Sequence, residues 1–134
     1  MTSLKILRTF WNTNVTDEGI KNLHLISLDV SGNPNVTDKG IQHMINSLKK
    51  LYVCNNENIT SEGIQNFKLD TLWLNQYGIG DEGIINMKLT ELNANNSKVT
   101  NKGIQNMNLS RIYFGQNSNI TKDGIKHMTN LKVN

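Results

Sequence analysis

The stretch Val36-Thr37-Asp38-Lys39-Gly40-Ile41 decides the fold, because its pattern returns along the whole chain. The pattern is a threonine (in all copies but one), two mostly polar residues, a glycine and an isoleucine. Its glycines, called the motif glycines below, recur at intervals of 20 to 23 residues: Gly19, Gly40, Gly63, Gly83, Gly103 and Gly124. Self-similarity at a short, regular period predicts a solenoid of stacked units.

A leucine opens each unit of this repeat. The units begin at Leu4, Leu25, Leu48, Leu69, Leu89 and Leu109, and a truncated seventh begins at Leu131. The repeat leaves no room for a linker or a second fold. We therefore expect a single domain over residues 1–134, made of six units plus the truncated seventh.

Each unit divides into two halves with different periodicity. The first half reads L-x-x-L-x-L, as in Leu48, Leu51 and Val53, and its alternation predicts a short strand with one buried face. In the second half the threonine suits a helix N-cap. The isoleucine and the apolar residue three positions later share one face of a helix. Few residues remain before the next leucine, so we expect helices of about two turns.

Asparagine recurs at the ninth position of the unit, where the chain leaves the strand: Asn12, Asn33, Asn56 and Asn117. A buried asparagine offers two donors and an acceptor to backbone groups that have lost their sheet partners. We expect these side chains to form a ladder through the turns. Tyr77 and Ser97 break the pattern, and Gln76 or Asn96 is expected to replace them.

The combination L-x-x-L-x-L-x-x-N resembles the leucine-rich repeat. The following [VI]-T-x-x-G-I resembles the cysteine-containing subtype of that family, with asparagine here in place of cysteine and with shorter units. The resemblance covers essentially the whole chain. It implies an α/β solenoid shaped as a horseshoe arc, with a parallel concave sheet and short convex helices. That subtype occurs in substrate-recognition subunits of ubiquitin ligases, but the fold hosts many unrelated partners.

Composition excludes several classes of protein. Charged residues make up only 19% of the chain, which is not the composition of a disordered segment. No apolar run approaches the ~18–20 residues of a membrane span, and the first residues lack the apolar core of a signal peptide. With a single cysteine, Cys54, an intracellular, cytoplasmic location is expected. The net charge of +3 is too mild and dispersed to indicate nucleic-acid binding.

The three histidines and the cysteine form no catalytic or metal-binding pattern. His43 and His127 share one repeat position on the helix side and, with His24, are expected to be exposed on the convex surface. Cys54 has no histidine or acid placed to activate it. We therefore expect no enzyme activity, no cofactor and no metal.

The strand residues that point away from the core are the informative ones. The fifth position of the six units holds Arg8, Asp29, Tyr52, Trp73, Asn93 and Tyr113, and the third position of the sixth unit holds Arg111. These seven residues are the candidate partner-binding set. Because neighbouring strands lie about 4.8 Å apart, Tyr52 and Trp73 should touch. Exposed aromatic residues beside charges are typical of protein-binding hot spots, although aromatics also simply favour strands.

The leading hypothesis is a non-catalytic module that recognises a protein partner on its concave face, without binding nucleic acid or membrane. The alternative is a scaffold or self-assembly unit that associates through its ends, giving a homo-oligomer. Repeat proteins normally need polar caps over their terminal units, whereas Leu4 and Leu7 stand near one end and Leu131 and Val133 near the other. A third reading is that the chain is a fragment of a longer array.

Overall fold

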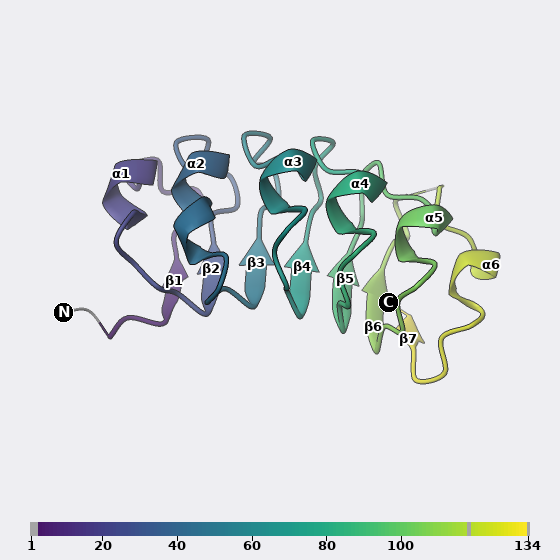
Figure 1. Ribbon diagram of the computed structural model, residues 1–134. Helices are drawn as coiled ribbons and strands as arrows, with labels where there is room; N and C mark the ends of the chain where they lie inside the picture. Colours follow the sequence, from purple (N-terminus) through teal and green to yellow (C-terminus); the bar gives the residue numbers. More distant parts are fainter. Residues whose placement is uncertain (1–2, 118, 134) are drawn as a thin grey trace.

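A computed structural model describes residues 3–117 and 119–133, which form one row of parallel strands faced by one row of short helices (Figure 1). The strands are β1 (Ile6–Arg8), β2 (Ser27–Asp29), β3 (Lys50–Tyr52), β4 (Thr71–Trp73), β5 (Glu91–Asn93), β6 (Arg111–Tyr113) and β7 (Lys132–Val133). The helices are α1 (Asp17–Ile20), α2 (Asp38–Ile41), α3 (Ser61–Ile64), α4 (Asp81–Ile84), α5 (Asn101–Ile104) and α6 (Lys122–Ile125), with a 3₁₀ turn, η1 (Gln42–Met44), after α2.

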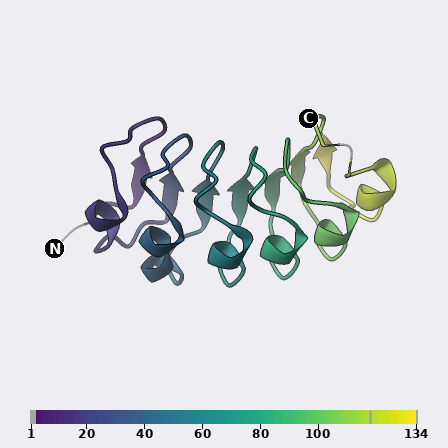
Figure 2. The same cartoon turned by 90° about the horizontal axis from the view of Figure 1, so that it is seen from above.

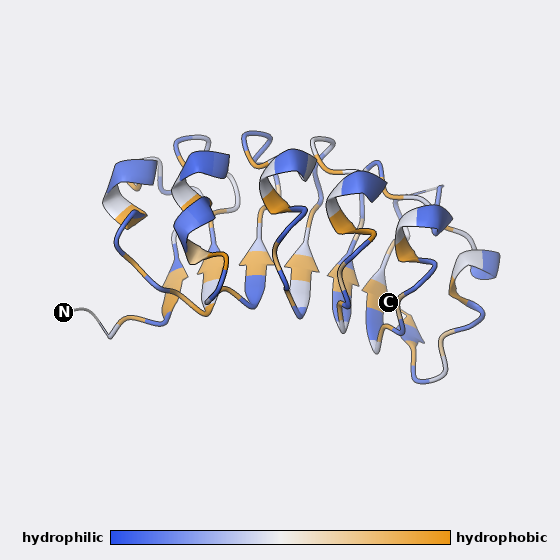
Figure 3. Ribbon diagram, viewed as in Figure 1, coloured by the Kyte–Doolittle hydropathy of each residue, from blue (hydrophilic) through white to orange (hydrophobic). Residues whose placement is uncertain are grey.

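The sheet runs in chain order from β1 to β7, and every pair is parallel. Leu28, Leu51 and Leu72 lie opposite one another in register and are fully buried. One continuous apolar core therefore runs between the sheet and the helices, and Figure 3 shows its hydrophobic segments at the same place in successive strands. The predicted α/β solenoid is confirmed.

The helices are shorter than the sequence led us to expect. Each α-helix spans four residues, a single turn rather than about two. Threonine caps them as predicted, and the Thr60 side chain accepts a hydrogen bond from the Gly63 N–H. Gly80 is the N-cap of α4, and Thr121 precedes α6 without a side-chain capping bond. Such helices are far below the ~20 apolar residues that cross a bilayer, and no described helix qualifies as a membrane span.

The asparagine ladder is present where a unit has a preceding neighbour. Asn33 and Asn56 are fully buried and Asn117 nearly so. Asn56 Nδ2 donates to the carbonyls of Asn33 at 2.7 Å and Val36 at 3.0 Å in the unit before it. Asn12 in the first unit is exposed.

Gln76 takes over the ladder in the fourth unit, as predicted, and donates to the carbonyl of Ile59 at 2.9 Å. The prediction for Asn96 is wrong, because Ser97 stays buried at the ninth position of the fifth unit. Its hydroxyl donates to the carbonyl of Ala94 in its own unit at 2.8 Å and accepts from Asn117 Nδ2 of the next unit at 3.4 Å. Asn96 has a φ of 51°, and its amide instead donates outside the core to Asn75 Oδ1 at 2.7 Å.

A second row of hydrogen bonds joins successive helices, and we call each such contact an Asp–Thr clamp. The carboxylate of Asp17 accepts from the N–H of Thr37 at 2.7 Å and from its hydroxyl at 2.6 Å, in the next unit. Asp38 holds Thr60 in the same way, and Asp81 holds Thr100. Each clamp thus satisfies the entrance of one helix with the carboxylate of the helix before it.

The clamps explain the motif glycines. A Cβ on Gly40 would overlap the Asp17 carboxylate, and one on Gly63 would overlap that of Asp38. Gly19 belongs to the first unit, and a Cβ there would meet only Thr16 Oγ1, at 3.8 Å. The glycine is therefore required by the neighbouring unit rather than by its own helix.

Candidate functional site

The candidate site lies on the sheet face turned away from the helices, which we call the concave face. In the view from above, the row of helices lies along the other side of the strands (Figure 2). Trp73 is half-buried on this face, whereas Leu72 and Leu74 on either side of it are fully buried. The predicted strand phase is therefore correct, and Trp73 does not belong to the core.

Three aromatic residues meet on this face, and we call them the aromatic cluster: Tyr52, Trp73 and Tyr113. The ring centroids of Tyr52 and Trp73 are 5.7 Å apart with planes at 56°, so the predicted contact is present. Those of Trp73 and Tyr113 are 5.3 Å apart at 54°. Both pairs have the spacing and tilt of favourable aromatic contacts.

The second contact joins strands that are not neighbours. Asn93 lies opposite both Trp73 and Tyr113 in the register of β4, β5 and β6. This shorter side chain is 9% exposed, and its Oδ1 accepts from the N–H of Asn95 at 3.1 Å. Asn93 therefore lies beneath the two rings as a spacer that lets them close over it, rather than standing out as a binding side chain of its own.

Glu91 belongs to the candidate site, although the sequence pattern did not indicate it. Its carboxylate accepts a hydrogen bond from Trp73 Nε1 at 3.0 Å. This bond fixes the indole and satisfies its only donor. Glu91 stands at the third position of its unit, and Trp73 stands at the fifth position of the unit before it. Only a comparison of these two different positions in adjacent units could have found the pair.

Charged residues lie on both sides of the aromatic cluster. Arg8 is in register with Asp29 at one end, and Arg111 with Glu91 toward the other. In residues 3–117 and 119–133 neither pair is an ion pair within 4.0 Å. Burial, together with the charges of Glu91 and Asp29, raises the pKa of Tyr52, so its hydroxyl stays protonated. Six of the seven predicted residues thus form one row along the face, with Arg111 in the neighbouring row. Ring contacts join Tyr52 to Trp73 and Trp73 to Tyr113.

The sequence model of a family described as Leucine Rich repeat matches residues 21–43, from the end of the first unit through β2 to η1. That segment is one of several equivalent units in the parallel array. The fold is a leucine-rich-repeat solenoid. A comparison with curated proteins found no match. Arrays of this kind present extended concave surfaces that commonly serve protein–protein interaction.

Two histidines of the leucine-rich-repeat solenoid bond to the backbone of the preceding unit. His43 Nε2 lies 3.0 Å from the carbonyl of Ile20, and His127 Nε2 lies 2.9 Å from that of Met107. His24 and His127 are exposed as expected, but His43 is half-buried, because its ring reaches back to the preceding unit. The described residues hold no group of three or more metal-ligating side chains.

Cys54 follows β3 at the rim of the concave face and is partly buried. Burial raises the pKa of the thiol above its ordinary value, the nearby Asp29 charge adds to this effect, and a hydrogen bond with Ser31 opposes it. The thiolate is the nucleophilic form, so this environment disfavours reactivity.

We expect folded Cys54 to be alkylated by iodoacetamide more slowly than a cysteine in an unstructured peptide at pH 8. Because the thiol pKa is raised, the rate should reach half its alkaline maximum at a higher pH than in the peptide. Mass spectrometry of the protein sampled over time from pH 7 to 10 measures both. A midpoint below that of the peptide would mean an activated thiol.

Proposed function

We propose that this protein is a non-catalytic recognition module, and that its concave face binds a protein partner with the aromatic cluster as the anchor. The observation that carries the proposal is a tryptophan outside the core whose orientation is fixed on three sides, by Tyr52, Tyr113 and Glu91. Large aromatic side chains, together with arginine, supply most of the energy in protein interfaces.

The rigidity of the cluster favours binding over a purely structural role. The rings are ordered before any partner arrives, so little side-chain entropy is lost on association. Arg8 and Arg111 are both exposed, and they stand five strands apart, about 24 Å at the usual spacing. They are positioned to set the register of a partner that crosses the sheet, while the rings between them supply the apolar contact.

Trp73→Ala should weaken partner binding by about 30-fold, or about 2 kcal/mol, because the anchor of the interface is removed. The matched control is Tyr77→Ala, since Tyr77 is also aromatic and is 57% exposed but lies outside the cluster. Affinity capture from an extract of the native host, quantified for wild type and both variants, identifies the partner. Isothermal titration calorimetry with that partner then gives the dissociation constants.

The fold of the Trp73→Ala variant can be checked separately, because Leu72 and Leu74 keep the core of β4 intact. We expect its far-ultraviolet circular dichroism to match that of wild type. If wild type and Trp73→Ala bind the captured partner equally well, the concave face is not the recognition surface.

The second candidate function, self-assembly through the ends, is favoured by two observations at the first unit. Large apolar side chains there remain exposed, from 43% at Leu4 to 67% at Trp11. The space beside Gly19 that an Asp–Thr clamp would fill is also open. At the other end, however, Lys122 holds the position of the clamp carboxylate, so a head-to-tail copy would lack that bond. Light scattering distinguishes a monomer from an assembly. Protein concentrations from about 10 µM to about 1 mM cover the range over which weak interfaces form.

A further inference from the structure

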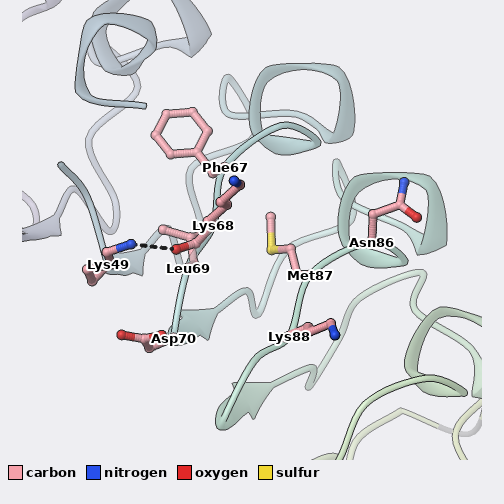
Figure 4. A pocket seen from close by; sticks show the side chains of 8 residues that line it. All are labelled: Lys49, Phe67, Lys68, Leu69, Asp70, Asn86, Met87 and Lys88. Carbon is pink, nitrogen blue, oxygen red and sulfur yellow. Dashed lines mark hydrogen bonds between the residues drawn. The ribbon is translucent and has the colours of Figure 1, made fainter. Parts of the chain in front are cut away.

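A pocket of about 310 Å³ opens between the loops that lead into β4 and β5 (Figure 4). Its floor is apolar: Phe67, Leu69 and Met87 contribute to it, each with no more than 3% of its surface exposed. Leu69 and Met87 face each other across the opening in Figure 4. The volume stands at the lower limit for ligand pockets, so it suits one apolar side chain rather than a cofactor.

Three lysines surround this pocket: Lys49, Lys68 and Lys88. All three are exposed, and Asp70 is the single acidic residue of the lining. Lys49 Nζ donates to the carbonyl of Lys68 at 3.4 Å. In the part of the chain that the structure describes, none of the three forms an ion pair.

The lysine rim carries three positive charges against the single negative charge of Asp70. Lys68 and Lys88 hold the same position in successive units, and Lys49 lies at the same opening. An anion at this opening is attracted by all three ammonium groups. The charge and the apolar floor together select an occupant that is both acidic and apolar.

The pocket lies beside the residues at which β3 and β4 begin. Lys49 and Asp70 immediately precede β3 and β4, the strands that end in Tyr52 and Trp73. Tyr52 stands three residues after Lys49, a distance of about 10 Å along the strand. A partner segment anchored on the aromatic cluster can therefore follow these strands back to the pocket.

We propose that this pocket binds an acidic peptide segment, with one apolar side chain inserted between Leu69 and Met87 and with flanking carboxylates on the three lysines. The proposal deepens the proposed function, on which it rests, by assigning the chemistry of the partner. Electrostatic complementarity of this kind chiefly sets specificity and association rate.

The test uses two synthetic heptapeptides with a central leucine, one flanked on both sides by glutamates and the other by lysines. The protein carries ¹³C-labelled methionine methyl groups. Met87 lines the pocket, while Met44, Met107 and Met128 lie in the core of other units and act as internal controls. We expect the acidic peptide to shift the Met87 resonance alone, at a concentration about tenfold lower than the basic peptide.

Matched triple variants separate the pocket from bulk charge. Replacing Lys49, Lys68 and Lys88 with glutamine should abolish the preference for the acidic peptide. Replacing Lys39, Lys102 and Lys122 with glutamine removes the same charge from exposed positions on α2, α5 and α6 and should leave the preference intact.

An unmoved Met87 resonance, equal response to both peptides, or equal behaviour of the two triple variants would each overturn the pocket proposal. Its failure is distinguishable from failure of the proposed function. If Trp73→Ala loses partner capture and the Met87 resonance does not shift, the concave face remains the recognition surface. Only the assignment of an acidic segment to the pocket is then removed.

Discussion

Gly40→Ala should destabilise the protein by about 3 kcal/mol, whereas Gly19→Ala should stabilise it by about 0.5–1 kcal/mol. At Gly40 the new Cβ would overlap Asp17 Oδ1 and lie 3.1 Å from Asp17 Cα. The carboxylate would have to move and would lose its bonds to the N–H and hydroxyl of Thr37. Because a backbone atom also lies close, rotation of the Asp17 side chain alone cannot relieve the contact.

At Gly19 the same substitution meets open space, since the nearest atom is Thr16 Oγ1 at 3.8 Å. Alanine loses less backbone entropy than glycine on entering a helix, which accounts for the expected gain. Urea unfolding monitored by circular dichroism measures both changes against wild type. Destabilisation of similar size at the two positions would show that the glycine is required within its own unit and that the clamp is not the reason for it.

Asn56→Ala should cost about 3 kcal/mol, because one side chain satisfies several buried groups at once. Its Nδ2 donates to the carbonyls of Asn33 and Val36, and its Oδ1 accepts from the N–H of Asn58 at 3.1 Å. Alanine would leave these groups buried without partners. Thermal unfolding by calorimetry measures the loss.

The matched control is Asn12→Ala, the same substitution at the same repeat position in the first unit. Asn12 is exposed and accepts only from the N–H of Asn14, at 3.1 Å, so we expect a loss below about 1 kcal/mol. Asn35 lies outside the ladder but is a poorer control than Asn12. Its Nδ2 donates to the carbonyl of Thr13 in the preceding unit at 2.7 Å, so its removal also loses a bond between units. Equal losses at Asn12 and Asn56 would contradict the ladder.

The strands, and the strand residues that face away from the core, could be predicted from sequence because both depend on alternation within one unit. Leu51 and Leu72 point inward, so Tyr52 and Trp73 must point outward. Helix length was harder to predict, because apolar spacing does not show where a helix ends: Ile41 and Met44 share a buried face although Met44 lies in η1.

Contacts that depend on the alignment of adjacent units could not be predicted in the same way. Glu91 reaches Trp73 only because the two strands pair in one particular register. The Asp17 carboxylate stands in the first turn of its own helix, where a negative charge is favourable, yet it bonds to the next helix. The repeat motif placed all these residues correctly, but a single unit does not show which neighbour each side chain will reach.

The contact between the third and fourth units lacks both residues of the Asp–Thr clamp. Ser61 stands where Asp17, Asp38 and Asp81 stand in other units, and Gly80 stands where the other units have threonine. The Ser61 hydroxyl accepts from the Gly80 N–H at 2.9 Å. An aspartate at position 61 would find no hydroxyl at Gly80 for its second oxygen, and a serine facing a threonine would supply only one of two acceptors. The residues at this contact are matched across two neighbouring units. Duplication or shuffling of a unit therefore preserves the array only when the neighbouring unit that carries the matching residue moves with it.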